Sequence, residues 1–120
     1  MTLKEKSIEN WSVGKRMYDK GKYDIAANRL YYALFQAAKC CAMDRGMTED
    51  GDEIGHYEVQ RDIAQFVKIE NSGRLYGKMK QFRTVADYRP YSVDATRFTQ
   101  SFVGELEKMH AELVTALGGC

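Results

Sequence analysis

One short segment of the chain brings charged and aromatic side chains close together. It reads RTVADYRPY, from Arg83 to Tyr91. Arg83 and Asp87 stand four residues apart, so on a helix they share a face, and a surface salt bridge is the simplest explanation. Tyr88 and Tyr91 could pack against the end of that helix. Because a guanidinium offers a planar two-point donor, the same segment is also a candidate phosphate-binding site.

A second segment, Tyr23 to Ala42, gathers its polar side chains into one narrow wedge. At about 100° per residue these side chains fall within roughly a quarter of the helix circumference. They are Asn28, Arg29, Tyr32, Gln36 and Lys39. The rest of the helix is apolar, which indicates a helix surrounded by others. The wedge therefore reaches the surface or faces a polar cleft.

Few other residues could do chemistry. The chain has two histidines, His56 and His110, and neither has the spacing of a zinc site. We expect both to be ordinary surface or boundary residues. The sequence lacks a glycine-rich phosphate loop, a Ser–His–Asp arrangement and a CxxC pattern. We therefore predict neither a metal nor a cofactor.

Composition and cysteine usage favour one cytoplasmic domain. The 120 residues are 44% hydrophobic without a long apolar run, so no membrane span is predicted, and the charged start does not resemble a signal peptide. Cys40 and Cys41 would point about 100° apart on a helix, and no cysteine pair has metal spacing. We therefore expect reduced thiols and a cytoplasmic location.

Charge is balanced overall but uneven along the chain. The net charge is +1, with an acidic stretch at residues 44–62 and a basic stretch at residues 68–97. The balance argues against broad coating of nucleic acid. The basic stretch permits a phosphate-bearing partner.

Helix patterns predict an all-α fold, an up-and-down bundle of four long helices plus one short helix within a single domain, 1–120. The expected helices cover residues 2–20, 24–45, 56–67, 74–88 and 93–117. Gly21 suits a left-handed helix end, Asp24 suits an N-cap, and Pro90 ends the fourth helix. A continuous apolar stripe runs along the last helix, and the tail 117–120 should fray.

NRLYYALFQAA, from Asn28 to Ala38, together with RTVADY about fifty residues later, resembles the HEPN domain family. The chain is similar in particular to small stand-alone prokaryotic members, in which a loop carrying a histidine, here His56, lies between the two motifs. The resemblance covers roughly residues 10 to 115. It implies a helical bundle that dimerises, with the polar ends of the second and fourth helices meeting in a shared cleft.

Many HEPN proteins are metal-independent ribonucleases that carry Arg, four to six residues, then His. Arg83 matches the signature arginine, but Tyr88 stands where the histidine would be. A phenol of ordinary pKa near 10 is a poor general base at neutral pH, so the departure favours binding over catalysis. Other family members are partners of minimal nucleotidyltransferases in toxin–antitoxin pairs.

Three hypotheses follow. The first is a nucleotide- or RNA-phosphate-binding domain that works beside a nucleotidyltransferase, with Arg29 and Arg83 on phosphate. In this hypothesis Asn28 and Asp87 orient the arginines, and Tyr32 or Tyr88 stacks or hydrogen-bonds. The second is a metal-independent ribonuclease using Arg83 with Tyr88 or His56. The third is a non-catalytic dimeric interaction module. A homodimer is expected from the resemblance, from the aromatic residues of the second helix and from the long stripe of the last.

Overall fold

The structure is a computed structural model, and it describes residues 1–47 and 55–117. In these ranges it contains five α-helices, one short 3-10 helix and no strand, so the predicted all-α class is confirmed. The helices are α1 (Leu3–Asp19), α2 (Tyr23–Asp44), α3 (His56–Asp62), α4 (Ser72–Tyr88) and α5 (Gln100–Thr115), with the 3-10 helix η1 (Ile63–Gln65) after α3.

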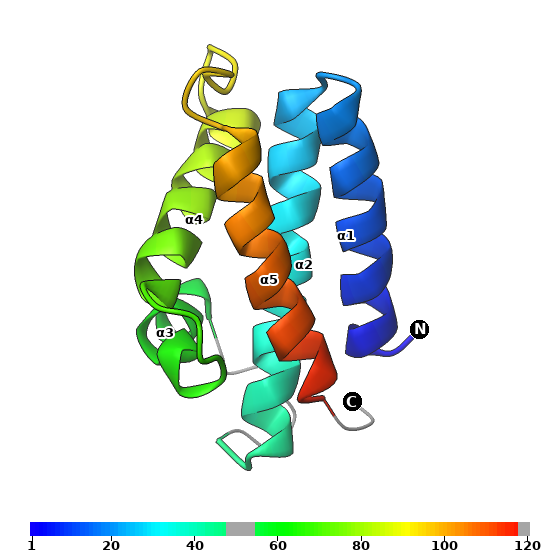
Figure 1. The fold of residues 1–120 in the computed structure, drawn as a ribbon, viewed down its shortest axis with the longest axis vertical. Helices are drawn as coiled ribbons and strands as arrows, with labels where there is room; N and C mark the ends of the chain where they lie inside the picture. Colours follow the sequence, from blue (N-terminus) through cyan, green and yellow to red (C-terminus); the bar gives the residue numbers. More distant parts are fainter. Residues whose placement is uncertain (48–54, 118–120) are drawn as a thin grey trace.

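Helices α1 and α2 form an antiparallel hairpin that runs the length of the molecule (Figure 1). Gly21 connects them with a φ of 75°, a left-handed conformation that glycine adopts without a steric penalty, as predicted. Thr2 caps α1 by accepting a hydrogen bond from the backbone N–H of Glu5 at 3.1 Å. The hairpin is close-packed, because Gly14 of α1 faces Leu30 of α2 and leaves no room for a Cβ.

Helix α2 lies among α1, α4 and α5 and buries most of its circumference (Figure 1). Its alanines and leucines have no exposed surface over most of its length, and Tyr31 is also fully buried. The polar residues of the wedge are exposed or half-buried. The expectation of an apolar helix with one polar strip is therefore met.

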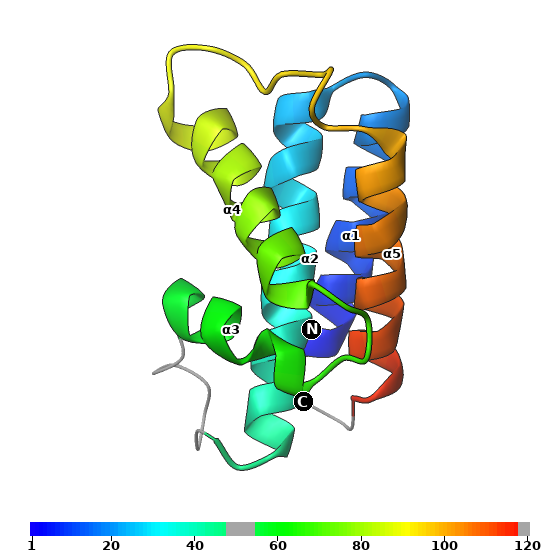
Figure 2. The same cartoon turned by 60° about the vertical axis from the view of Figure 1, so that its left-hand side comes forward.

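Helix α3 and η1 form a small separate layer beside the lower half of α2 and below α4 (Figure 2). Val59, Ile63 and Phe66 bury their side chains in the core from this layer. Sequence reasoning predicted one helix over 56–67, whereas the α-helix ends at Asp62 and tightens into η1. Asn71 then takes a left-handed φ of 62° at the start of α4.

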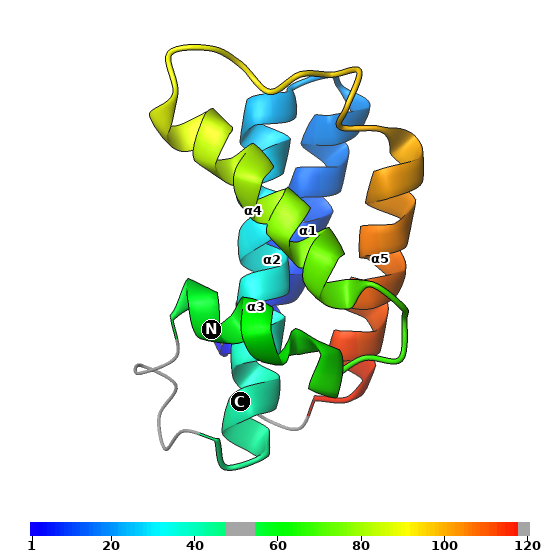
Figure 3. The same ribbon diagram turned by 90° about the vertical axis from the view of Figure 1, so that its left-hand side faces the viewer.

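The segment between α4 and α5 is a long loop that passes over one end of the molecule (Figure 3). Helix α5 begins at Gln100, so the start at residue 93 that was expected for the helix over 93–117 is wrong. The carboxylate of Asp94 accepts bonds from the backbone N–H and the hydroxyl of Thr96, at 2.9 and 2.7 Å, and so forms a local turn. Thr99 then caps α5 by accepting from the N–H of Phe102 at 3.1 Å.

The same loop explains why Asp24 does not cap α2. Lys22 occupies the N-cap position without a side-chain hydrogen bond. Asp24 instead accepts the backbone N–H of Val93 at 2.8 Å and so ties the loop to the start of α2. The apolar stripe of α5 is buried from Phe98 to Leu117, the first residue of the tail expected to fray. The remaining tail residues lie outside the described ranges.

The cysteines differ from expectation. Cys41 is a free, buried thiol, and burial raises its pKa to about 11, so it remains protonated at neutral pH. Cys40 is disulfide-bonded, so the expectation of reduced thiols is wrong for this residue. The cysteines therefore no longer support a cytoplasmic location, which stays a prediction. None of the helices in the described ranges has the length and apolar content that crossing a membrane requires.

Candidate phosphate-binding site

The candidate site is centred on Arg83, in the last turn and a half of α4. Its Nε atom lies 3.0 Å from Oδ2 of Asp87, one helical turn further on. The contact is an ion pair without the alignment of a hydrogen bond. The side chain of Arg83 is 12% exposed and that of Asp87 is 25% exposed, so the pair is partly shielded from water. The salt bridge that the i, i+4 spacing predicts is confirmed.

Three tyrosine rings surround the guanidinium of Arg83. Its central carbon lies 5.4 Å from the ring centroid of Tyr31 and 5.3 Å from those of Tyr32 and Tyr88. These distances are typical of cation–π contacts. The Nη2 atom also donates to the hydroxyls of Tyr32, at 2.8 Å, and of Tyr88, at 3.4 Å. The tyrosines therefore hold the plane of the guanidinium in one orientation.

The surroundings of Arg83 stabilise its positive charge. Burial lowers the pKa of Arg83, but the Tyr32 hydroxyl, Tyr88 and Asp87 outweigh that effect, so the net direction is upward. Beneath the cluster, Tyr76 donates to the hydroxyl of Tyr31 at 3.0 Å. Burial raises the pKa of Tyr31 to about 12, so it stays neutral and serves the site as a packed ring.

Helix α2 contributes the polar partner of Asp87. The amide nitrogen of Asn28 lies 3.1 Å from both carboxylate oxygens of Asp87 and donates to them. The carboxylate therefore joins the wedge of α2 to the arginine of α4. Of the six site residues predicted from the sequence, the structure brings five into this cluster. They are Asn28, Tyr32, Arg83, Asp87 and Tyr88.

The sixth predicted residue, Arg29, has a different neighbour. Its Nη1 atom donates to the side-chain oxygen of Asn10 on α1 at 3.2 Å, and Asn10 in turn donates to Gln36 of α2 at 2.9 Å. These three residues line a shallow hollow of about 310 Å³ between α1 and α2, together with Lys6 and Glu9. Arg29 is therefore placed beside α1, on the other edge of the wedge from the Arg83 cluster.

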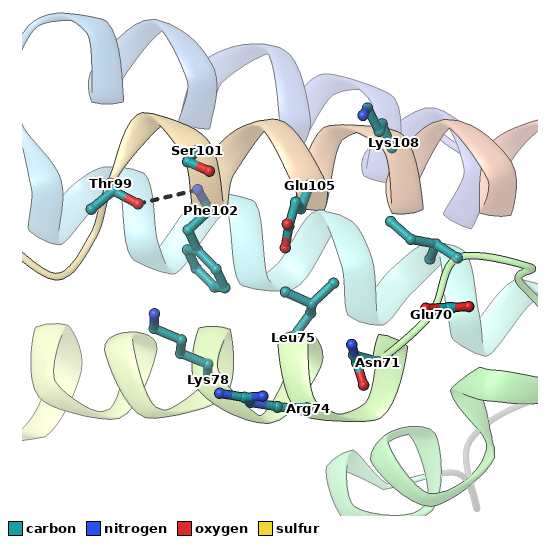
Figure 4. A pocket seen from close by; sticks show the side chains of 11 residues that line it. Glu70, Asn71, Arg74, Leu75, Lys78, Thr99, Ser101, Phe102, Glu105 and Lys108 are labelled. Carbon is teal, nitrogen blue, oxygen red and sulfur yellow. Dashed lines mark hydrogen bonds between the residues drawn. The ribbon is translucent and has the colours of Figure 1, made fainter.

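A wider hollow of about 690 Å³ lies between α4 and α5 (Figure 4). Leu75 and Phe102 line its apolar side, and side chains of both charges line its rim. The charged side chains are Glu70, Arg74, Lys78, Glu105 and Lys108. Because acidic and basic side chains both line this hollow, it favours an anionic ligand less than the Arg83 cluster does.

Metal chemistry finds no support among the residues that the structure describes. They contain no group of three or more His, Cys, Asp or Glu side chains placed to hold a metal ion. His56 begins α3, but its side chain lies outside the described part of the structure, so its predicted role is not tested.

Sequence reasoning missed a buried histidine cluster on the other side of the molecule. His110 is 7% exposed, and Nε2 lies 2.8 Å from the Ser7 hydroxyl of α1. Trp11 stacks on the imidazole at 4.8 Å, and Ser7 donates to the Ala33 carbonyl at 2.6 Å. The expectation of a surface or boundary histidine is therefore wrong. The position of His110 on the flank of the apolar stripe was the available signal.

Comparison with known proteins agrees with this architecture. The family model described as the HEPN domain matches residues 1–117. The chain belongs to the HEPN domain family. No curated protein and no solved structure matches it significantly. The HEPN match thus covers every residue of the Arg83 cluster and both motifs that carry the resemblance.

Proposed function

We propose that this HEPN domain binds the phosphate of a nucleotide or RNA at the Arg83 cluster. The proposal rests on which nitrogen atoms of the Arg83 guanidinium already have partners. Asp87 takes its Nε edge and the tyrosines take Nη2, while Nη1 has no hydrogen bond among the described residues. A fixed, charged donor with a free edge is preorganised for a phosphate oxygen.

The surrounding residues have separate roles in this proposal. Asn28 and Asp87 hold the arginine in position, and the exposed ring of Tyr88 is available to stack on a base. Tyr32 fixes the guanidinium plane. Arg29 supplies a second cation on the other edge of the wedge, beside α1, and contacts a more distant part of the ligand.

Binding, and not catalysis, is the primary function that we propose. Cleavage of RNA without a metal needs a group that exchanges protons near pH 7, and Tyr88 occupies the position of the family histidine. The partner that we propose is a minimal nucleotidyltransferase, as in toxin–antitoxin pairs of this family. Finding such a gene beside the gene for this chain would support that part of the proposal.

Titration with adenosine monophosphate, followed by NMR, tests the phosphate site. We expect Arg83→Gln to weaken binding at least tenfold and Arg29→Gln to weaken it severalfold. Arg16→Gln, an exposed arginine of α1, is the matched control and should leave binding unchanged. Unaltered affinity in Arg83→Gln would contradict the proposal. Absence of binding to the wild-type protein would favour a plain interaction module.

An RNA-cleavage assay in the presence of a chelator separates binding from catalysis. We expect the wild-type protein to cleave slowly or not at all. Rapid cleavage that Tyr88→Phe abolishes would instead make the ribonuclease hypothesis primary.

A further inference from the structure

A third hollow lies on α4 close to the Arg83 cluster, and Thr84, the residue after Arg83, lines it. It has a volume of about 450 Å³ and is bounded by α3, α4 and the first residues of the following loop. The side chains that give it a polar character are Gln60, Lys80, Gln81, Thr84, Arg89 and Tyr91. The hollow includes none of the residues assigned above to phosphate binding.

The charge of this hollow has one sign. Lys80 and Arg89 line it, and no carboxylate of a described residue does. Neither cation forms an ion pair within the described residues. The hollow between α4 and α5 differs, because Glu70 and Glu105 stand among its cations. Two cations without an ion-pair partner in this lining favour an anionic occupant.

A glycine of α4 shapes the floor of the hollow. A Cβ at Gly77 would lie 2.5 Å from Nε2 of Gln60, the end of a flexible side chain, so a larger residue would displace the carboxamide of α3 from its place against the helix. Glycine in the middle of a helix destabilises it relative to alanine. With glycine at this position, the carboxamide of Gln60 lies against α4 and lines the same hollow as Lys80 and Arg89.

The hollow and the Arg83 cluster are neighbours along α4, because Thr84, which lines the hollow, directly follows Arg83, and the helix ends at Tyr88. This residue follows Thr84 by one helical turn, and its hydroxyl lies 3.4 Å from Nη2 of Arg83. Tyr88 and Tyr91 are 67% and 62% exposed, and Arg89 stands between them. Exposed aromatic rings next to cations are the features with which proteins bind unpaired bases and their phosphates.

We propose that this hollow is a second subsite, which takes the phosphate and base adjacent to the one held at Arg83. The ligand is then a single-stranded RNA of two or more nucleotides, and Lys80 and Arg89 contact its second phosphate. Tyr91 stacks on the second base. The inference rests on the proposed function of Arg83, which supplies the first phosphate contact.

The test compares two probes, adenosine monophosphate and a fluorescein-labelled RNA of six adenylates. The variant Lys80→Gln/Arg89→Gln removes both cations of the hollow. The matched control is Arg74→Gln/Lys108→Gln, which removes two cations from the hollow between α4 and α5. Binding of the RNA is measured by fluorescence anisotropy at several salt concentrations. Binding of the monophosphate reports both the Arg83 site and correct folding of each variant.

We expect the wild-type protein to bind the RNA at least tenfold more tightly than the monophosphate. Lys80→Gln/Arg89→Gln should lose tenfold or more in RNA affinity and keep its affinity for the monophosphate within twofold. The slope of log affinity against log salt concentration should be less negative by about 1.4 in this variant. The variant lacks two phosphate contacts, and each contact to a single strand contributes about 0.7 to the slope. The control pair should change neither affinity by more than twofold.

Two results would overturn the inference in distinguishable ways. If the monophosphate binds through Arg83 but the RNA gains nothing, or if the two double variants behave alike, the second subsite is wrong and the phosphate site stands. If the wild-type protein binds neither probe, the proposed function fails and the subsite fails with it.

Discussion

At the scale of single residues, Arg83 is fixed by contacts that a simple cation could not satisfy together. The guanidinium meets Asp87 through Nε and two tyrosine hydroxyls through Nη2, while three rings lie within about 5.4 Å of its central carbon. A planar group with five donors can make these contacts and still keep Nη1 without a hydrogen bond. The geometry therefore depends on arginine itself and not only on positive charge.

We expect Arg83→Lys to keep the charge but to lose at least tenfold in affinity for adenosine monophosphate. The lysine ammonium is a point charge that can pair with Asp87 or meet a phosphate, but cannot hold a fixed plane against Tyr32. Calorimetric titration of the variant measures the change. Wild-type affinity in Arg83→Lys would show that charge alone is sufficient.

The buried His110 predicts a pH dependence of stability. Burial lowers its pKa to about 4, whereas a histidine of an unfolded chain has a pKa near 6.5. Between these values the unfolded chain binds a proton that the folded chain does not, so stability falls as the pH falls from about 6.5 towards 4. The loss is at most about 3 kcal/mol.

Urea unfolding at several pH values between 4 and 7.5 checks this dependence. His110→Gln, which has no imidazole to protonate, should be less stable at pH 7 but should show a flatter profile across this range. An equally steep profile in His110→Gln would assign the dependence to other groups.

Residue spacing predicts contacts within a helix better than contacts between helices. The Arg83–Asp87 pair follows directly from its i, i+4 spacing. The bond from Asn28 to Asp87 spans 59 residues, and the contact of Ser7 with His110 spans 103. Such pairs depend on the rotation and distance of packed helices, which no local pattern encodes. The HEPN resemblance supplied the pairing of α2 with α4 but not that of α1 with α5.

At the scale of elements, two glycines inside helices provide a matched test of close packing. Gly14 of α1 is buried, and a Cβ there would lie 2.8 Å from two side-chain carbons of Leu30. Gly104 of α5 has no atom of a neighbouring element within 4 Å of such a Cβ. Neither has a positive φ, so alanine fits both backbones.

We expect Gly14→Ala to lower the free energy of unfolding by about 1–3 kcal/mol, because α1 and α2 must separate to admit the methyl group. Gly104→Ala should raise it by up to about 1 kcal/mol through helix propensity. Urea unfolding at pH 7 measures both. If both substitutions stabilise the protein, the hairpin is less closely packed than described.

Element boundaries show where local sequence patterns stop being decisive. The left-handed conformation of Gly21 and the end of α4 before Pro90 were predictable, because glycine and proline constrain the backbone directly. The start of α5 was not. Residues 93–98 fit a helical pattern, but the Asp94 turn and the bond from Val93 to Asp24 stabilise a loop instead. Asp24 was assigned a capping role from local sequence, although its partner lies 69 residues away.

At the scale of the whole molecule, a single copy buries most of the apolar surface that suggested a dimer. The apolar stripe of α5 and the ring of Tyr31 are hidden within one copy, so this part of the reason for a dimer is wrong. The polar wedge of α2 keeps some accessible surface, since Arg29 is exposed and the other wedge residues are half-buried. Ile25 is 48% exposed on this face of α2, which also carries the half-buried rings of Tyr32 and Phe35. Dimerisation itself stays a prediction.

We expect two copies to associate through this face, which would bring the two Arg83 clusters towards a shared cleft. Light scattering at micromolar concentration should give about twice the chain mass of 13.8 kDa. Ile25→Lys should yield the monomer, because it replaces an exposed apolar side chain of this face with a charge that the second copy would bury. Ile8→Lys on α1, where the isoleucine is 45% exposed, is the matched control and should remain a dimer. A wild-type mass of 13.8 kDa would refute the dimer, and a dimeric Ile25→Lys would move the interface to another face.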